Sequence, residues 1–165
     1  MNNLKVPTMA EMIAEGKVPK ILFWVGCAGS FDDRAKKITK AIVKILNHCD
    51  VSFAVLGTEE SCTGDPAKRA GNEFTFQMQA MMNIQVLDGY EVKRIVTGCP
   101  HCFNTLKNEY PELGGNYEVL HHTQLIQDLI NTGKLALQNG ETYKGKKITF
   151  HDPCYLGRAN DVYEA

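Results

Sequence analysis

Short apolar runs alternate with longer segments of mixed apolar and polar residues along most of the chain. Five of these runs have the length of a β-strand, and residues that favour turns follow most of them. The pattern therefore predicts strands over residues 20–25, 51–56, 91–97, 117–120 and 146–150.

The remaining segments carry helical signals. Apolar residues recur at helical spacing over residues 32–48, which is typical of an amphipathic helix. Asp65 and Pro66 have the pattern of an N-cap followed by proline in the first turn. Helices are also predicted over residues 9–16, from 65 to about 87, from 100 to before 111, and over 123–131. The second of the long helices carries an apolar stripe that we expect in the core, formed by Phe74, Met78, Met81 and Met82.

Strands that alternate with helices indicate an α/β fold with a mostly parallel sheet. Right-handed crossovers then place helices on both faces and the cysteine loops at the C-terminal edge of the strands. We expect three parts: an N-terminal arm over residues 1–19, a first cysteine-rich α/β domain over 20–145, and the start of a second repeat over 146–165.

The expected second repeat is based on an internal correspondence. Three residues of the first strand and its loop match three residues near the end of the chain at a constant offset of 127 positions (154 − 27). The matched pairs are Ile21 and Ile148, Phe23 and Phe150, and Cys27 and Cys154. A strand that ends in a cysteine loop thus recurs, and we expect a domain boundary to interrupt this second copy.

Composition limits the environment of the protein. The 165 residues are 44% hydrophobic and 22% charged, with a net charge of -1, which gives no reason to expect nucleic acid as a partner. No apolar stretch approaches the roughly 20 residues that cross a bilayer, and the first 20 residues lack the apolar core of a signal peptide. We therefore expect a cytoplasmic protein, where cysteines stay reduced.

Four of the six cysteines follow predicted strands. Cys27 follows the first strand, Cys62 the second, and Cys99 and Cys102 the third. Because the C-terminal ends of parallel strands share one edge of the sheet, we expect these thiols to converge there. Convergent reduced thiols favour a metal or iron–sulfur site over disulfides.

The segment Cys99-Pro100-His101-Cys102 leaves two chemistries open. Two thiols separated by two residues at a helix start can ligate a metal or cluster, or they can form a redox dithiol. Cys49 lies at the opposite edge of the sheet and is expected to be structural. His121 and His122 follow the fourth strand and are expected to be core or helix-start residues rather than ligands.

Three segments resemble the cysteine-rich CCG domain family. They are SCTGDPAKR from Ser61 to Arg69, CPHC from Cys99 to Cys102, and HDPCYLGR from His151 to Arg158. Family members include the heterodisulfide reductase B subunit, the glycolate oxidase iron–sulfur subunit and lactate-utilisation proteins. The resemblance implies an electron-transfer component, itself non-catalytic, whose cysteines hold an iron–sulfur cluster beside a flavin- or ferredoxin-type partner protein.

One residue departs from the family pattern. The family's Cys-Cys-Gly is Ser61-Cys62-Thr63-Gly64 in this chain. The five thiols that the family's noncubane cluster uses are therefore not available here, whereas four thiols satisfy a [4Fe–4S] cubane or a structural zinc. Cys154 is expected to be a ligand of a second, incomplete site.

Three functions follow from these observations. The first is an iron–sulfur electron-transfer domain of an oxidoreductase, with Cys27, Cys62, Cys99 and Cys102 as cluster ligands. The second is a structural or interaction domain with zinc in the same four thiols. The third is a dithiol–disulfide oxidoreductase that works through the two cysteines of the CPHC segment.

Overall fold

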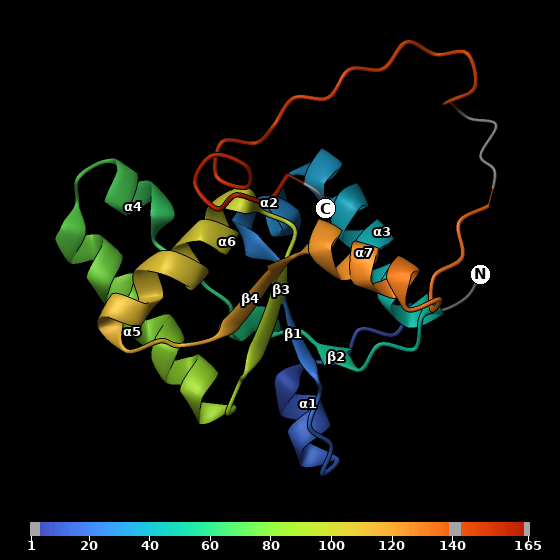
Figure 1. The fold of residues 1–165 in the computed structure, drawn as a ribbon. Helices are drawn as coiled ribbons and strands as arrows, with labels where there is room; N and C mark the ends of the chain where they lie inside the picture. The colour runs from blue at the N-terminus through green and yellow to red at the C-terminus, as the bar shows by residue number, and fades with distance from the viewer. Residues whose placement is uncertain (1–3, 139–142, 164–165) are drawn as a thin grey trace.

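A parallel β-sheet forms the centre of the protein. The computed structural model describes residues 4–138 and 143–163, and within them the sheet has four strands in the order β2-β1-β3-β4, all parallel (Figure 1). The strands are β1 (Ile21–Trp24), β2 (Phe53–Ala54), β3 (Arg94–Thr97) and β4 (Glu118–His121). The predicted α/β fold with a parallel sheet is confirmed.

Helices cover both faces of this sheet (Figure 1). The α-helices are α1 (Met9–Ala14), α2 (Gly26–Phe31), α3 (Asp33–His48), α4 (Asp65–Arg69), α5 (Glu73–Gly89), α6 (Pro100–Asn104) and α7 (His122–Asn131). Shorter turns are the 3₁₀ helices η1 (Gly57–Glu59) and η3 (Tyr110–Leu113) and the π-helical turn η2 (Thr105–Glu109). Among the described residues, none of these helices has the length and apolar character needed to cross a bilayer.

Alternating side chains of the strands divide the interior into two cores. Leu22 and Trp24 of β1 join a cluster that includes residues of α5 and α6, whereas Ile21 and Phe23 join a cluster with α3 and α7. This alternation follows from the two-residue period of a strand. Because both faces are buried, the strand sequence is continuously apolar, as is usual for parallel sheets.

The strand order creates a topological switch point between β1 and β3, where the connections of two neighbouring strands run in opposite directions. The chain leaves β1 toward β2 on one side, and it leaves β3 toward β4 on the other side. The two connections therefore diverge over opposite faces of the sheet, since α3 and α6 belong to different cores. Ligands of open α/β folds bind in the crevice that such divergence leaves at the C-terminal strand ends.

The N-terminal arm packs along the edge of the sheet. Thr8 forms a parallel bridge with Val55, and the Met9 side chain is buried in the core beside β1. Thr8 also caps α1 through a reciprocal capping box with Glu11. Residues before α1 thus extend the sheet beyond β2.

The long helix predicted from residue 65 to about 87 is divided in two. Gly71 has a φ of +79°, which ends the first segment because only glycine adopts this conformation without strain. The Asn72 side chain then accepts a hydrogen bond from the backbone N–H of Thr75 and starts α5. The expected N-cap, Asp65, is instead the first residue of α4, and Gly64 occupies the cap with a φ of +87°.

The apolar stripe on α5 is not in the core, so this prediction was wrong. Apolar residues are distributed around the helix among polar ones, and its buried side consists of Phe76, Ala80, Asn83, Ile84 and Leu87. The four residues predicted to be buried are exposed: Phe74, Met78, Met81 and Met82. When both sides of a helix carry apolar residues, periodicity cannot tell which side faces the sheet.

The fifth predicted strand does not form. Residues 146–150 have no regular secondary structure, and Ile148 and Phe150 are exposed. An apolar run becomes a strand only where a neighbour accepts and donates its backbone hydrogen bonds. Here the segment pairs with none of the four strands.

The residues after this segment pack back onto the domain. Leu156 is buried in the same core as Trp24. The Asn160 side chain donates to Oδ1 of Asn104 and accepts from the side chain of Asn108. Residues 153–163 therefore lie across the C-terminal edge of the sheet, beside α6 (Figure 1).

This packing predicts the effect of removing its apolar anchor. Leu156→Ala should lower the free energy of unfolding by about 2–4 kcal/mol, because the substitution leaves a cavity in the core. Leu137→Ala is the matched control, since that side chain is exposed and its loss should cost less than about 0.5 kcal/mol. Urea denaturation measures the free energy of unfolding of both variants. Equal denaturation midpoints for the two would show that residues 153–163 do not pack on the domain.

Candidate metal centre

Four thiols line one cavity at the C-terminal edge of the sheet. The cavity has a volume of about 430 Å³, and the cysteines on its wall are Cys27, Cys62, Cys99 and Cys102. Cys27 lies in the first turn of α2 after β1, and Cys99 and Cys102 lie at the start of α6 after β3. The cavity therefore opens at the switch point, with Cys62 reaching it from the loop after β2.

The loop before Cys27 brings the backbone close to the other thiols. Gly26 has a φ of +76°, and a Cβ at this position would lie 3.5 Å from Sγ of Cys102. A larger residue would be strained in this conformation and would place its side chain against that sulfur. The sequence predicted an irregular loop here, whereas the chain forms the short helix α2.

Glu60 joins the first and second cysteine loops. Its carboxylate accepts hydrogen bonds from the backbone N–H of Val25, at 3.0 Å, and from that of Gly26, at 2.6 Å. Burial raises the pKa of Glu60 to about 7, although the two N–H donors act in the opposite direction. Sequence reasoning missed this role, because Glu59 and Glu60 are adjacent acids and no pattern shows which of them is half-buried against the first loop.

The loop that carries Cys62 supplies donors to two sulfurs. The backbone N–H of Gly64 donates to Sγ of Cys62 at 3.5 Å, and the hydroxyl of Thr63 donates to Sγ of Cys102 at 3.9 Å. Burial raises the pKa of Cys62, and the nearby thiol of Cys27 acts in the same direction. The thiols of these two loops therefore lie within interaction range of each other.

The two thiols of the CPHC segment differ in acidity. The S–H of Cys102 donates to Cys99, and this bond lowers the pKa of Cys99, with help from the backbone N–H groups of His101 and Cys102. The same bond, together with burial, raises the pKa of Cys102. Cys99 is therefore the thiol of the pair that ionises first.

A buried carboxylate supports this segment from the side of α4. Asp65 accepts from the hydroxyl of Thr105 at 3.3 Å, contacts Nδ1 of His101 at 2.9 Å and pairs with Nε of Arg69 at 3.4 Å. Arg69 also pairs with Glu109. Asp65 thus ties α4 to α6, whereas the sequence pattern predicted a helix cap.

Ser61 does not face the cavity. Its hydroxyl donates to Oδ1 of Asn83 at 2.8 Å, and it is not among the residues that line the site. The Asn83 amide donates in turn to the carbonyl of Cys62 and to the hydroxyl of Tyr110. Ser61, where the resemblance implies a cysteine, therefore takes part in a hydrogen-bond network with Asn83 and Tyr110.

The remaining candidate residues lie outside this cavity. Cys49 is buried in the core between α3 and the sheet, and Cys154 is exposed in the C-terminal segment. The rings of His121 and His122 contact each other at an interplanar angle of 58°, with centroids 4.2 Å apart. Burial lowers the pKa of His121 to about 4 and also lowers that of His122, so both rings are neutral at pH 7.

The donor set suits an iron–sulfur cluster. Within residues 4–138 and 143–163, no three His, Cys, Asp or Glu side chains are grouped so as to hold a single metal ion as they lie. A cluster is held by thiolates distributed around it, and here four thiols line one cavity, while the Thr63 hydroxyl and the Gly64 N–H donate to two of their sulfurs.

Comparison with known proteins gives the family. The CCG cysteine-rich domain matches residues 21–107, more than half of the chain. The chain belongs to the CCG cysteine-rich domain family. The matched range contains all four cavity cysteines and ends before Cys154.

Curated relatives of this CCG domain are iron–sulfur and redox proteins by name. The probable iron-sulfur-binding oxidoreductase FadF of Bacillus subtilis is 49% identical over 160 residues, which cover 97% of this chain and 22% of that protein. The EtfAB:quinone oxidoreductase of Syntrophomonas wolfei is 46% identical, over 96% of this chain and 22% of the relative. A component of the dihydromethanophenazine:CoB--CoM heterodisulfide reductase of Methanosarcina barkeri is 33% identical, over 88% of this chain and 36% of that component.

The chain thus spans between about a fifth and about a third of the length of these relatives. No solved structure matches it.

The hydrogen bonds of Glu60 generate a first test of the site. Glu60→Gln replaces one acceptor oxygen by an N–H donor, so one backbone N–H beside Cys27 loses its partner, and the free energy of unfolding should fall by about 1–3 kcal/mol. Glu59→Gln is the control, because Glu59 accepts from the exposed hydroxyl of Tyr90 and not from the cysteine loops. Urea denaturation of metal-free, reduced protein compares the two, and similar losses would contradict the role of Glu60.

The acidity of Cys99 generates a second test. In metal-free, reduced protein, the rate of Cys99 alkylation by iodoacetamide should rise with pH through a midpoint below the ordinary thiol pKa of about 8.5, because the thiolate is the reactive form. Cys102→Ala removes the S–H donor and should shift this midpoint to higher pH. Mass spectrometry of peptides follows each cysteine, and an unshifted midpoint would show that Cys102 does not stabilise the thiolate.

Proposed function

We propose that this CCG domain is an iron–sulfur electron-transfer domain of a larger oxidoreductase, and that Cys27, Cys62, Cys99 and Cys102 ligate one cluster. The observation that carries the proposal is the shared cavity, in which thiols from three separate loops face a common space. The names of the relatives support it, because they are iron–sulfur and redox proteins.

The number of thiols favours a [4Fe–4S] cubane. Four cysteines line the cavity, and a cubane takes four thiolates. A five-thiol noncubane cluster would need a further ligand, but the Ser61 hydroxyl is engaged with Asn83. The domain itself would pass electrons without carrying out the net reaction.

The electron donor and the electron acceptor of this domain would reside on other domains or proteins. The sequence contains no nicotinamide or flavin fingerprint, so we infer a flavin- or ferredoxin-type redox partner. Relatives that are named an EtfAB:quinone oxidoreductase and a component of a heterodisulfide reductase support a redox partner of this kind.

We further propose that residues 146–165 begin a second copy of the domain. The support is the repeated sequence pattern of an apolar run followed by a cysteine, together with the exposure of Ile148 and Phe150, whose counterparts Ile21 and Phe23 are buried in β1. Cys154 would then be a ligand of the second site.

A dithiol oxidoreductase is the second candidate, and the unequal acidity of Cys99 and Cys102 favours it. A low-pKa thiol beside a protonated partner at a helix start is the arrangement of thiol–disulfide exchange enzymes. This function needs no metal and would leave Cys27 and Cys62 without a role. Reduction of insulin disulfides by the metal-free protein would support it.

Metal analysis separates these functions. Protein reconstituted anaerobically should contain about four iron and about four acid-labile sulfide per chain, and dithionite should produce an EPR signal of a reduced cluster. Cys99→Ser should lose most of the visible absorption, whereas Cys49→Ser, at the buried cysteine outside the cavity, should retain it. If the protein instead contains one zinc per chain and no sulfide, the electron-transfer function is wrong and the four thiols form a structural zinc site.

A further inference from the structure

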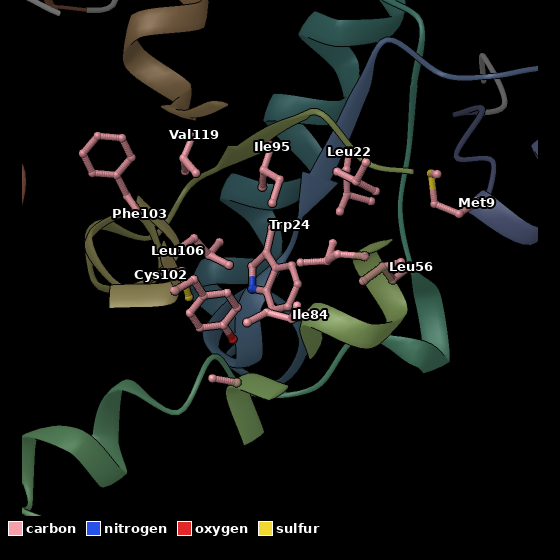
Figure 2. Packing of buried hydrophobic residues seen from close by; sticks show 14 of the residues in the cluster. Met9, Leu22, Trp24, Leu56, Ile84, Ile95, Cys102, Phe103, Leu106 and Val119 are labelled. Atoms are coloured by element: carbon pink, nitrogen blue, oxygen red, sulfur yellow. The ribbon is translucent and has the colours of Figure 1, made fainter. Parts of the chain in front are cut away.

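Trp24 is the last residue of β1 and lies three positions before Cys27. Its side chain is fully buried, and it lines the same cavity as the four thiols. In Figure 2 the indole nitrogen is on the side of the ring that faces Cys102. The indole therefore forms part of the wall of the candidate metal centre.

The indole N–H has no hydrogen-bond partner within the described residues. A buried tryptophan normally directs this group at an acceptor, and an unpaired buried donor costs about 1–3 kcal/mol. Two other donors beside the sulfurs are paired in the structure, since Thr63 donates to Cys102 and Gly64 donates to Cys62. The unpaired donor belongs to a side chain that lines a cavity of thiols, so an acceptor bound in that cavity could satisfy it.

Sulfur supplies an acceptor of suitable chemistry. The sulfides and thiolates of an iron–sulfur cluster carry negative charge and accept hydrogen bonds from N–H groups, which tune the reduction potential. A single zinc ion in the same thiols would bring no inorganic sulfide into the cavity. The unpaired donor thus fits a negatively charged sulfur in the cavity, and both the sulfides and the thiolates of the proposed cluster are such acceptors.

We propose that the indole N–H of Trp24 donates a hydrogen bond to a sulfur of the bound cluster and raises its reduction potential. This inference rests on the proposed iron–sulfur function. One-electron reduction adds negative charge to the cluster, so the hydrogen bond is stronger in the reduced state and favours it. The proton stays on the indole nitrogen throughout, and Trp24 acts only as a hydrogen-bond donor.

The test compares the midpoint potential of reconstituted wild-type protein with that of Trp24→Phe. The electron comes from dithionite in an anaerobic redox titration followed by EPR. Loss of the N–H should change the ratio of reduced to oxidised cluster at a given potential by about tenfold toward the oxidised state, which is about 59 mV for one electron. Iron and sulfide content should stay near that of the wild type.

Phe23→Leu is the matched control. Phe23 is the adjacent aromatic residue of β1, but it is buried in the core on the opposite face of the sheet. The control perturbs packing by a similar amount without touching the cavity, so its potential should equal that of the wild type. An equal shift in both variants would assign the effect to packing and overturn the proposal.

An isosteric analogue removes the risk that Trp24→Phe fails to fold. The chain contains one tryptophan, so growth with a benzothienyl analogue of tryptophan, in which sulfur replaces the indole N–H, changes this position alone. The same lowered potential is expected. In addition, proton ENDOR of the reduced wild-type protein should show a strongly coupled exchangeable proton that the analogue lacks.

The outcomes separate this inference from the function on which it rests. If reconstitution yields no iron and sulfide, the proposed function fails. If a cluster forms but the analogue leaves both the potential and the ENDOR signal unchanged, the cluster function stands and the role of Trp24 is overturned.

Discussion

Thiolates repel one another and are costly to bury, yet this domain brings four thiols from three loops to the wall of one cavity. The backbone must therefore hold them in place. Parallel strands provide the framework, because β1 and β3 end side by side while their connections leave toward opposite faces. The carboxylate of Glu60 then fixes the first loop to the second through two backbone N–H groups. Asp65 performs a similar task between α4 and α6.

The same loops also supply the electrostatic environment of the sulfurs. Hydrogen bonds from Thr63, from the backbone of Gly64 and from the start of α6 stabilise negative charge on sulfur. The neutral rings of His121 and His122 lie outside the cavity. The loops therefore supply hydrogen-bond donors to the sulfurs and lower the pKa of Cys99, whereas burial raises the pKa of Cys62, and the bond to Cys99 together with burial raises that of Cys102.

Two further features lie at the surface of the domain. The C-terminal segment is docked through Leu156, and its Tyr155 ring lies 4.5 Å from the ring of His101 in the CPHC segment. The residues that carry Cys154 are thereby held next to the first site. On α5, the exposed apolar side chains of Phe74 and its methionine neighbours are left uncovered within the described part of the chain.

The sequence by itself determined the parallel α/β fold, the edge at which the thiols meet and the separate place of Cys49, because these follow from strand order and from loop positions along the chain. It also identified the family through its cysteine motifs. Tertiary structure decided the rest. The buried side of α5 could not be read from a helix whose apolar residues lie on several sides, and the run at residues 146–150 lacks a neighbouring strand to pair with. The roles of Glu60, Asp65 and Trp24 depend on contacts between residues about 35 or more positions apart or on the wall of a cavity, and no local pattern encodes such contacts.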